Sequence, residues 1–266
     1  MICMSDTVDR YNGRPVGSPL TAASVRRARS PKTSERVARE LVNHIVDNDL
    51  QEGTMLPNEK QLVEIFEVGR TTLREALRLL ETRGAITIRP GPRGGPVVRR
   101  PRPDDLREGL SLLLQFTGAS LFDVFEARTA LEPMMAHLAA TRISDEQLER
   151  LDDTVARMRE HPNDHEVFLE ENQRFHGIVA EATGSTILRV FNETLKSIAD
   201  GAVVGVKYTA RRRAAVAQAH ERVVEALRRR DAGAAQEAMR AHVGEAGEYW
   251  WRKYPELVSR GVRWAH

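Results

Sequence analysis

The sequence predicts a mainly α-helical protein, with a small N-terminal domain of helices and one β-hairpin followed by a C-terminal all-helical antiparallel bundle. Two observations predict this fold class. Apolar residues recur at helical spacing through most of the chain, and strand-like alternation is confined to a glycine-rich stretch near residue 90. The charge divides at a similar place: residues 1–102 hold 18 Lys/Arg and 12 Asp/Glu, a balance of +6, whereas the remainder holds 22 and 26, a balance of −4.

A pair of helices joined by a tight turn is predicted between residues 56 and 83. Asn58 is a strong helix N-cap, and the acidic residue that follows it suits the positive end of a helix dipole. The Val68–Gly69 pair interrupts the helical spacing and permits a sharp turn. A second helix is expected from about Thr71 to Arg83.

The outward face of this second helix carries side chains that suit DNA. A recognition helix places its N-terminal residues against base edges, and an arginine guanidinium matches guanine O6 and N7. Threonine hydroxyls and helix N-terminal amides suit phosphate oxygens. The side chains on this face are Arg70, Thr71, Arg74 and Arg78.

A β-hairpin is predicted to follow, with residues 85–89 and 97–99 as its strands. The segment PGPRGGP between them has three glycines and Arg93, so its tip is small and basic and can enter a minor groove or lie along a phosphate backbone. Between residues 68 and 102, nine arginines stand against two glutamates, 9 − 2 = +7, in a chain of net charge +2. This concentration of positive charge, with the order of the elements, indicates nucleic-acid binding rather than a merely solvated surface.

These features resemble the winged helix-turn-helix of the GntR family of bacterial transcription regulators, over residues 34–100. The leading helix ERVARELVNHIVDNDL and the motifs LP-x-E and R-x-x-L-R-E-A-L carry the resemblance, and RTTLRE is similar to the FadR branch. The DNA contacts that the resemblance implies, together with Thr71 from the helix face, are Lys60, Arg70, Thr71, Thr72, Arg74, Gly91, Arg93 and Gly94. Lys60 stands where the family usually has Arg, which keeps the charge without bidentate geometry. Gly69 stands where Ser or Thr is usual, and it caps a helix without offering a hydroxyl.

Composition bounds the remaining possibilities. The apolar run LSLLLQF is far too short to span a bilayer, the N-terminus lacks the order of a secretory signal, and the single cysteine excludes an internal disulfide. We therefore expect a soluble, cytoplasmic protein without a membrane partner. Residues 1–30 are expected to be a disordered basic arm, which either adds nonspecific DNA affinity or is dispensable. The DNA-binding domain is expected at residues 31–100 and a stiff proline-containing linker at 101–105.

The remainder is predicted to be helical, at about residues 105–116, 120–141, 145–160, 165–182, 186–208, 211–230 and 232–250. Three histidines lie on separate predicted helices, at His176, His220 and His242. His220 and His242 each lie about eleven residues from the turn DAG that joins their helices, so antiparallel packing brings them to one height. Asn172 shares a helix face with His176. Such a set would suit Zn, Ni or Mn, and ordinary core histidines are the alternative.

This region resembles the FCD effector domain of the FadR subfamily, through FEART-LEP, ENQRFH-x-x-I, ATGS and the two AH-containing segments around His220 and His242. The resemblance implies that residues 106–250 dimerise and hold a divalent metal beneath a pocket for a small carboxylate effector. Asn172 stands where Asp is more usual, so the site either binds metal less tightly or serves as a polar effector pocket. Arg128 either clamps the effector carboxylate or forms a structural salt bridge. The tail, residues 251–266, is expected to cap the bundle or to contact a second subunit.

The sequence is compatible with two functions. The first is a dimeric regulator, usually a repressor in this family, whose affinity for a palindromic operator changes when a metabolite enters the bundle. The alternative is a three-histidine metalloenzyme with an accessory basic domain, which needs a general acid or base beside the metal. No Glu or Asp has a spacing that places it beside His176, unless Glu171 or a residue from another helix is recruited. The sequence has no HExxH motif, nucleophile elbow or phosphate loop. It therefore favours a regulator without enzymatic activity.

Overall fold

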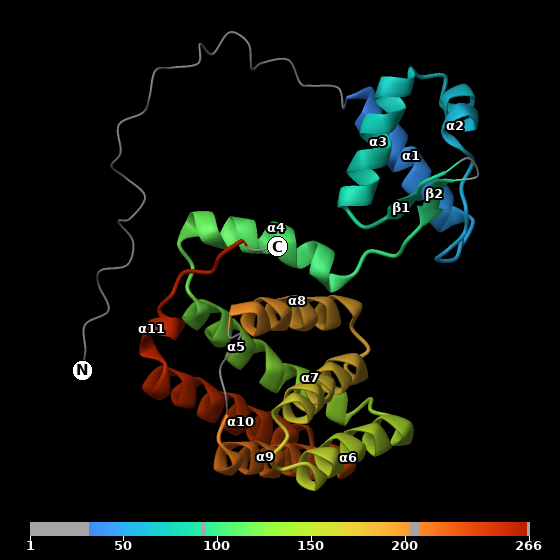
Figure 1. The fold of residues 1–266 in the computed structure, drawn as a ribbon. Coiled ribbons are helices and arrows are strands. Elements are labelled where there is room, and N and C mark those ends of the chain that lie inside the picture. The colour runs from blue at the N-terminus through green and yellow to red at the C-terminus, as the bar shows by residue number, and fades with distance from the viewer. Residues whose placement is uncertain (1–31, 92–93, 203–207, 265–266) are drawn as a thin grey trace. The chain divides into compact units, whose positions relative to one another are not determined.

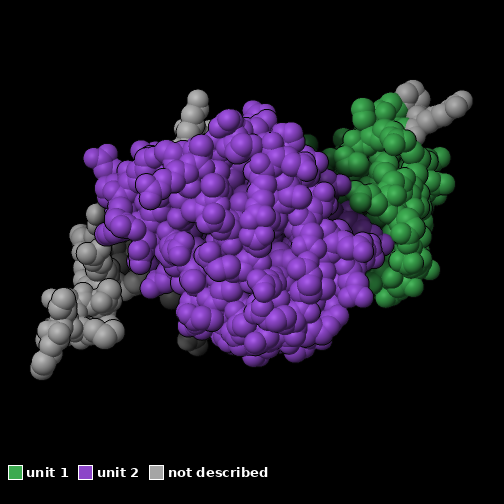
Figure 2. Space-filling view, turned by 90° about the horizontal axis from the view of Figure 1, so that it is seen from below, with its two compact units in different colours: residues 1–99 green, residues 100–266 purple. Residues whose placement is uncertain are grey.

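The computed structural model describes residues 32–91, 94–202 and 208–264. The basic arm expected at residues 1–30 and the wing residue Arg93 lie outside the described residues. Internal contacts divide the chain into two compact units, residues 1–99 (unit 1) and residues 100–266 (unit 2), which Figure 2 shows in two colours.

Unit 1 has three helices followed by an antiparallel hairpin, as the sequence predicts (Figure 1). Its elements are α1 (Thr33–Asp47), α2 (Glu59–Phe66), α3 (Arg70–Thr82), β1 (Ile86–Arg89) and β2 (Gly95–Val98). In the hairpin register, Ile86 pairs with Val98 and Arg89 with Gly95. The apolar faces of the helices and the hairpin form one core, in which Leu62 and Leu73 are 1% and 0% exposed.

Local sequence signals explain the boundaries of α2. Asn58 and Gln61 form a reciprocal capping box: the Gln61 backbone N–H donates to Asn58 Oδ1 at 3.0 Å, and the Asn58 N–H donates to Gln61 Oε1 at 2.9 Å. The helix ends at Glu67, whose φ of 50° turns the chain toward α3. The predicted tight turn between the two helices is thus made by Glu67, Val68 and Gly69.

The hairpin has a neighbour that the sequence did not predict. Backbone hydrogen bonds join it to the segment before α2, from Leu56 N to Pro96 O and from Val98 N to Thr54 O, both 2.9 Å long. This segment covers one edge of β2 and anchors the wing to the body of unit 1.

Unit 2 is helical in its described residues. Its helices are α4 (Pro103–Thr117), α5 (Leu121–Ala140), α6 (Asp145–Glu160), α7 (His165–Ala182), α8 (Thr186–Ala202), α9 (Ala210–Arg228), α10 (Ala232–Lys253) and α11 (Pro255–Val258). Helix α4 begins at Pro103, inside the stretch expected to be a linker, because proline fits the first turn of a helix and Asp105 accepts a hydrogen bond from the Arg102 backbone.

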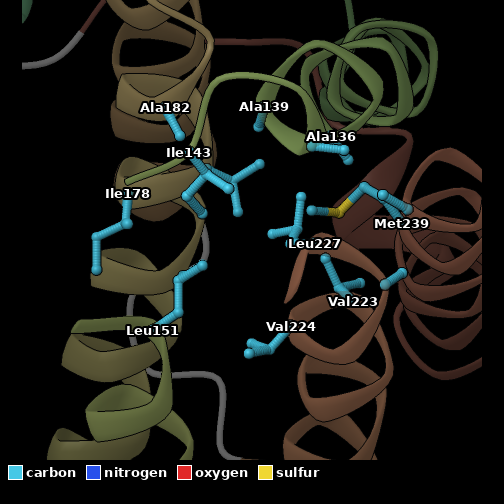
Figure 3. Close-up of a cluster of buried hydrophobic side chains, with 14 of the residues drawn as sticks. Ala136, Ala139, Ile143, Leu151, Ile178, Ala182, Val223, Val224, Leu227 and Met239 are labelled. Atoms are coloured by element: carbon cyan, nitrogen blue, oxygen red, sulfur yellow. The ribbon is translucent and has the colours of Figure 1, made fainter. Parts of the chain in front are cut away.

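The main core of unit 2 lies among α5, α6, α7, α9 and α10. Figure 3 shows how side chains from these helices meet, among them Ala136 of α5, Leu151 of α6, Ile178 of α7 and Leu227 of α9. Because each helix contributes an apolar stripe, the rotation of every helix about its own axis is fixed. The polar residues of those helices are therefore held at defined positions.

The C-terminal tail packs back onto the start of α5. The backbone of Leu121 donates to Arg260 O at 3.1 Å, and that of Val262 donates to Ala119 O at 2.8 Å. Val262 is 5% exposed in an apolar cluster with Leu121 and Ile198. Among the described residues, no helix has the length and apolar content needed to cross a membrane.

Candidate DNA interface and buried histidine site

The first two turns of α3 carry half of the eight predicted DNA contacts. Arg70, Thr71 and Arg74 are exposed there, and Thr72 is half-buried. Leu73, on the opposite face, is fully buried, so core packing determines which face α3 turns to solvent. The structure thus places these four candidates within two consecutive turns of one helix.

Helix α2 adds a further cation beside this turn. Lys60 is exposed in the first turn of α2, and the neighbouring Glu59 carboxylate lies 3.0 Å from Nε of Arg74. An exposed ion pair of this kind contributes little to stability, but it ties the side chain of Arg74 to the start of α2. Gly69 is the N-cap of α3 and has no side chain to accept a hydrogen bond, which leaves the first backbone amides of α3 open to an acceptor such as a phosphate oxygen.

The wing depends on two of its glycines for different reasons. Gly91 has a φ of +108°, which side chains rarely adopt. At Gly94 a Cβ would overlap the carbonyl oxygen of Arg89 and lie 2.7 Å from the carbonyl carbon of Pro90. At Gly91 and Gly94 the backbone therefore favours glycine over any residue with a side chain.

Three helices of unit 2 bring the predicted histidines together. His176 of α7, His220 of α9 and His242 of α10 are 4%, 0% and 4% exposed. The Nε2 atoms of His220 and His242 are 3.2 Å apart, and those of His242 and His176 are 3.3 Å apart. The ring of Phe175 stacks on that of His220 at a centroid distance of 3.6 Å and fixes its orientation. The equal spacing of His220 and His242 from the turn between their helices does place them at one level.

A buried carboxylate that the sequence did not single out completes this cluster. Glu132 of α5 is 2% exposed, and its Oε2 lies 2.7 Å from Nδ1 of His176. Its Oε1 accepts a hydrogen bond of 2.6 Å from Nε of Arg128, one helical turn earlier. The structural salt bridge, one of the two roles expected for Arg128, is therefore present. The i, i+4 spacing of Arg128 and Glu132 in the sequence is typical of such a pair.

Electrostatics sets the protonation of the cluster. Burial is the main cause that lowers the pKa of His220 well below its ordinary value and the pKa of His242 to about 3, and neighbouring histidines contribute to both shifts. Burial by itself raises the pKa of the Glu132 carboxyl, but Arg128 and His176 outweigh burial and hold this pKa well below its usual range. His220 and His242 are therefore neutral and able to offer lone pairs, and Glu132 is ionised.

This donor set fits a divalent metal. For tetrahedral coordination with metal–nitrogen bonds of about 2.0–2.1 Å, two ligand nitrogens are separated by about 3.3 Å, close to the two Nε2 separations found here. Glu132 occupies the place of a carboxylate that orients a metal-bound imidazole through its other nitrogen. The ligand atoms of His176, His220 and His242 all lie within 4.8 Å of one another. These three side chains could hold one metal ion.

A cavity adjoins the three histidines. Each of α7, α9 and α10 lines it with residues that are four positions apart along the helix. The positions concerned are Phe168, Asn172 and His176 on α7, His242, Ala246 and Trp250 on α10, and Arg212 and Val216 on α9, with His220 next along α9. Because α9 and α10 are antiparallel, the residues two turns from the histidines lie at the same end of the cavity. That end is aromatic: the ring of Tyr208 lies 5.0 Å from that of Phe168 and 5.5 Å from that of Trp250.

Asn172 and Arg128, two further predicted site residues, line this cavity together with His176 and His242. Glu171, the nearby residue of α7 that the metalloenzyme alternative could recruit as an acid or base, is engaged elsewhere. Its Oε1 lies 2.6 Å from Nε of Arg157, and its Oε2 lies 3.3 Å from Nη1 of Arg174. It is not among the residues that line the cavity.

Comparisons with known proteins give the same division into two parts. Residues 33–94 match the family described as bacterial regulatory proteins, gntR family, and residues 123–245 match the FCD domain. The HTH-type transcriptional repressor NanR of Cronobacter sakazakii is 31% identical over 235 residues, which cover 82% of this chain and 85% of the relative. NanR of Salmonella arizonae is 29% identical over 255 residues, 92% of this chain and 95% of the relative.

A solved structure is similar over nearly its whole length. The structure of Streptococcus agalactiae GntR superposes with a TM-score of 0.64 and 28% sequence identity, covering 81% of this chain and 99% of that chain. Both the sequence and the fold thus resemble transcription regulators with a helix-turn-helix and a helical second domain.

Proposed function

We propose that this chain represses genes by binding a short palindromic operator as a homodimer. The premise is that the chain belongs to the GntR family of transcription regulators, with an N-terminal GntR helix-turn-helix and a C-terminal FCD domain. A small carboxylate metabolite bound in the cavity of unit 2 changes its affinity for the operator. The family consists of regulators rather than enzymes, so the metalloenzyme alternative is set aside. Such a repressor works in the cytoplasm, where the bacterial chromosome lies.

The observation that carries the DNA-binding part is the exposed first turn of α3. Arg70, Thr71 and Arg74 stand on a helix whose opposite face is fully buried, so their directions are fixed before DNA arrives. Arginine at this place suits guanine edges, and Thr71 and the free amides after Gly69 suit phosphates. Lys60 and the wing residues Gly91, Arg93 and Gly94 add contacts to the phosphate backbone of the DNA.

The regulatory part rests on the buried site of unit 2. His176, His220 and His242 would hold a divalent ion such as Zn²⁺, Ni²⁺ or Mn²⁺, with the Asn172 amide oxygen as a further neutral ligand. When bound, the ion supplies a Lewis-acidic point to which a carboxylate oxygen binds. Glu132 holds His176 in the orientation that this role needs, and Arg128 is held by Glu132 at the wall of the cavity.

Homodimerisation follows from the symmetry of the expected operator. A two-fold symmetric pair of reading heads recognises an inverted repeat, and a ligand that alters the spacing of the heads alters the affinity for fixed half-sites. By linkage, the operator and the metabolite change each other's affinity by the same factor.

The test is the selection of bound sequences from a random duplex pool at about physiological salt, where nonspecific binding is weak. The full chain is used twice, once with Zn²⁺ added and once after treatment with a chelator. We expect an enriched inverted repeat in at least one state and a dimer on that repeat by sedimentation. Enrichment of no sequence in either state would overturn the proposed function.

A further inference from the structure

The charges around the cavity of unit 2 are unequal at its two ends. Two arginines line the cavity, Arg128 and Arg212, and none of its described lining residues is Asp or Glu. The charge of Arg128 is balanced by Glu132, whose carboxylate is buried beside it and accepts its Nε–H at 2.6 Å. Arg128 therefore brings little net charge to the histidine end of the cavity.

Arg212 has no such balance. Among the described residues, no carboxylate lies within ion-pair distance of its guanidinium, and its buried Nε has no hydrogen-bond partner. Its guanidinium carbon lies 4.9 Å from the centre of the Tyr249 ring, a cation–π contact that leaves the charge unneutralised. A partly buried, uncompensated guanidinium on the wall of a cavity is a binding point for an anion.

The position of Arg212 on α9 sets its distance from the histidines. Arg212, Val216 and His220 follow one another at intervals of four residues, so Arg212 and His220 are eight residues, or about 12 Å, apart along the helix axis. Arg212 stands at the aromatic end with Tyr208 and Trp250, and the histidines stand at the other end. One carboxylate at the histidines would leave the charge of Arg212 unmatched.

We propose that Arg212 binds a second anionic group of the effector, so that the effector is a short-chain dicarboxylic acid rather than a monocarboxylic acid. One carboxylate faces the histidines, and the other accepts hydrogen bonds from the guanidinium fork of Arg212 at the aromatic end. The rings of Phe168, Tyr208 and Trp250 exclude water around this second contact and strengthen it. This inference rests on the proposed function, since it names the class of metabolite that the same cavity takes.

The test compares acids that differ only in their second carboxylate. Succinate, glutarate and adipate are titrated calorimetrically into the Zn²⁺-loaded full chain, against butyrate, valerate and caproate as partners of equal carbon number. We expect at least one diacid to bind about tenfold or more tightly than its monoacid partner, a difference of about 1.4 kcal/mol. Diacids that bind no more tightly than their partners, or that do not bind, would overturn the proposal.

Variants assign this discrimination to Arg212. Arg212→Gln is expected to abolish the difference between diacid and monoacid, and Arg212→Lys to retain part of it, because lysine keeps the charge without the fork. Arg211→Gln removes the same charge from the exposed neighbour on α9 and should keep the wild-type ratio. If Arg212 serves only to pack on Tyr249, Arg212→Gln will lower the thermal midpoint while the ratio stays as in the wild type.

The same data separate this inference from the proposed function. Operator selection with the wild-type chain is performed without any acid, so an enriched repeat stands whether or not diacids bind. Conversely, discrimination lost in Arg212→Gln would show the dianion site even if no operator were found. An enriched repeat combined with equal binding of diacids and monoacids would leave the regulator intact and refute the role given to Arg212.

Discussion

The two units of the chain hold their candidate functional side chains in opposite ways. In unit 1, Arg70, Thr71 and Arg74 are exposed, and Ser34 is the one polar side chain that is buried among the described residues. In unit 2, Glu132, His176, His220 and His242 are all buried and in contact with one another. Substitutions in unit 1 should therefore change binding without changing stability, whereas substitutions in the buried cluster should change both.

The largest effect is expected from removing the buried carboxylate. Glu132→Gln deprives Arg128 and His176 of their common partner inside the bundle, which should lower the free energy of unfolding of unit 2 by about 3–5 kcal/mol. All three tryptophans, Trp250, Trp251 and Trp264, belong to unit 2, so tryptophan fluorescence during urea denaturation reports on this unit.

The matched control is Glu126→Gln on the exposed face of the same helix. It removes the same charge and should change the free energy of unfolding by less than about 0.5 kcal/mol. Equal effects of the two substitutions would show that the contacts of Glu132 do not stabilise unit 2.

A pH titration of the metal-free protein should expose the same buried cluster. The folded-state pKa of His242 is lowered to about 3 and that of His220 is also lowered, whereas both are near 6.5 in the unfolded chain. Below pH 6.5 the unfolded chain therefore binds protons that the folded chain does not. Stability is present above pH 6.5 and is lost as the pH falls toward 3, by up to about 1.4 kcal/mol per pH unit for each histidine.

The measurement is urea denaturation followed by tryptophan fluorescence after treatment with a chelator. Because the pKa of Glu132 is itself lowered in the folded state, its own contribution begins to disappear only below its ordinary value of 4.5. Between pH 6.5 and 4.5 the change in the free energy of unfolding therefore reports on the histidines and not on Glu132. A free energy of unfolding that is constant through this window would contradict the assignment of neutral, buried imidazoles.

In unit 1 the largest effect is expected on DNA binding. Arg70→Ala should cost about 1–3 kcal/mol of affinity for the selected operator, the value of one arginine–guanine contact, and leave unfolding unchanged. Arg83→Ala removes the same charge at the opposite end of α3 and serves as the control. Gel-shift titration at fixed salt checks both. Equal losses in the two variants would mean that only general charge is lost and that Arg70 reads no base.

The comparison of the units also explains what the sequence could predict. The helix-turn-helix depends on local signals such as the Asn58 cap and the interruption at Gly69, which lie close together in the chain. The meeting of His220 and His242 could be predicted because both are equidistant from one turn, and the resemblance to the FCD domain added His176. Contacts between helices that neither signal covers were missed.

Glu132 and Arg212 are the two important residues in that missed group. The sequence places Glu132 one turn after Arg128, but only the rotation of α5 in the packed bundle shows that it faces His176. Arg212 stands in the run Arg211, Arg212 and Arg213, and the sequence does not tell which member of that run turns inward. Contacts between helices that are far apart in the sequence determine which way both side chains face.

A substitution at the fourth predicted ligand would sharpen the contrast between the units. Asn172→Asp adds a carboxylate to the cavity and should tighten Zn²⁺ binding by about tenfold, roughly 1.4 kcal/mol, while weakening the binding of acids by charge repulsion. Competition with a chromogenic chelator measures the first effect and calorimetry the second. Gln218→Glu, which adds a charge on the exposed face of α9, is the control and should change neither.

The smallest effect is expected at the wing, where close backbone contacts at Gly94 decide the outcome. Gly94→Ala places a Cβ 2.7 Å from the carbonyl carbon of Pro90, so the backbone of the hairpin loop must shift. We expect operator affinity to fall about threefold to tenfold, roughly 0.7–1.4 kcal/mol, with tryptophan-monitored unfolding unchanged. Gly69→Ser is the contrasting variant, because no atom lies within 4 Å of a Cβ there and serine caps a helix well. If both substitutions weaken DNA binding equally, the wing does not contribute through its shape.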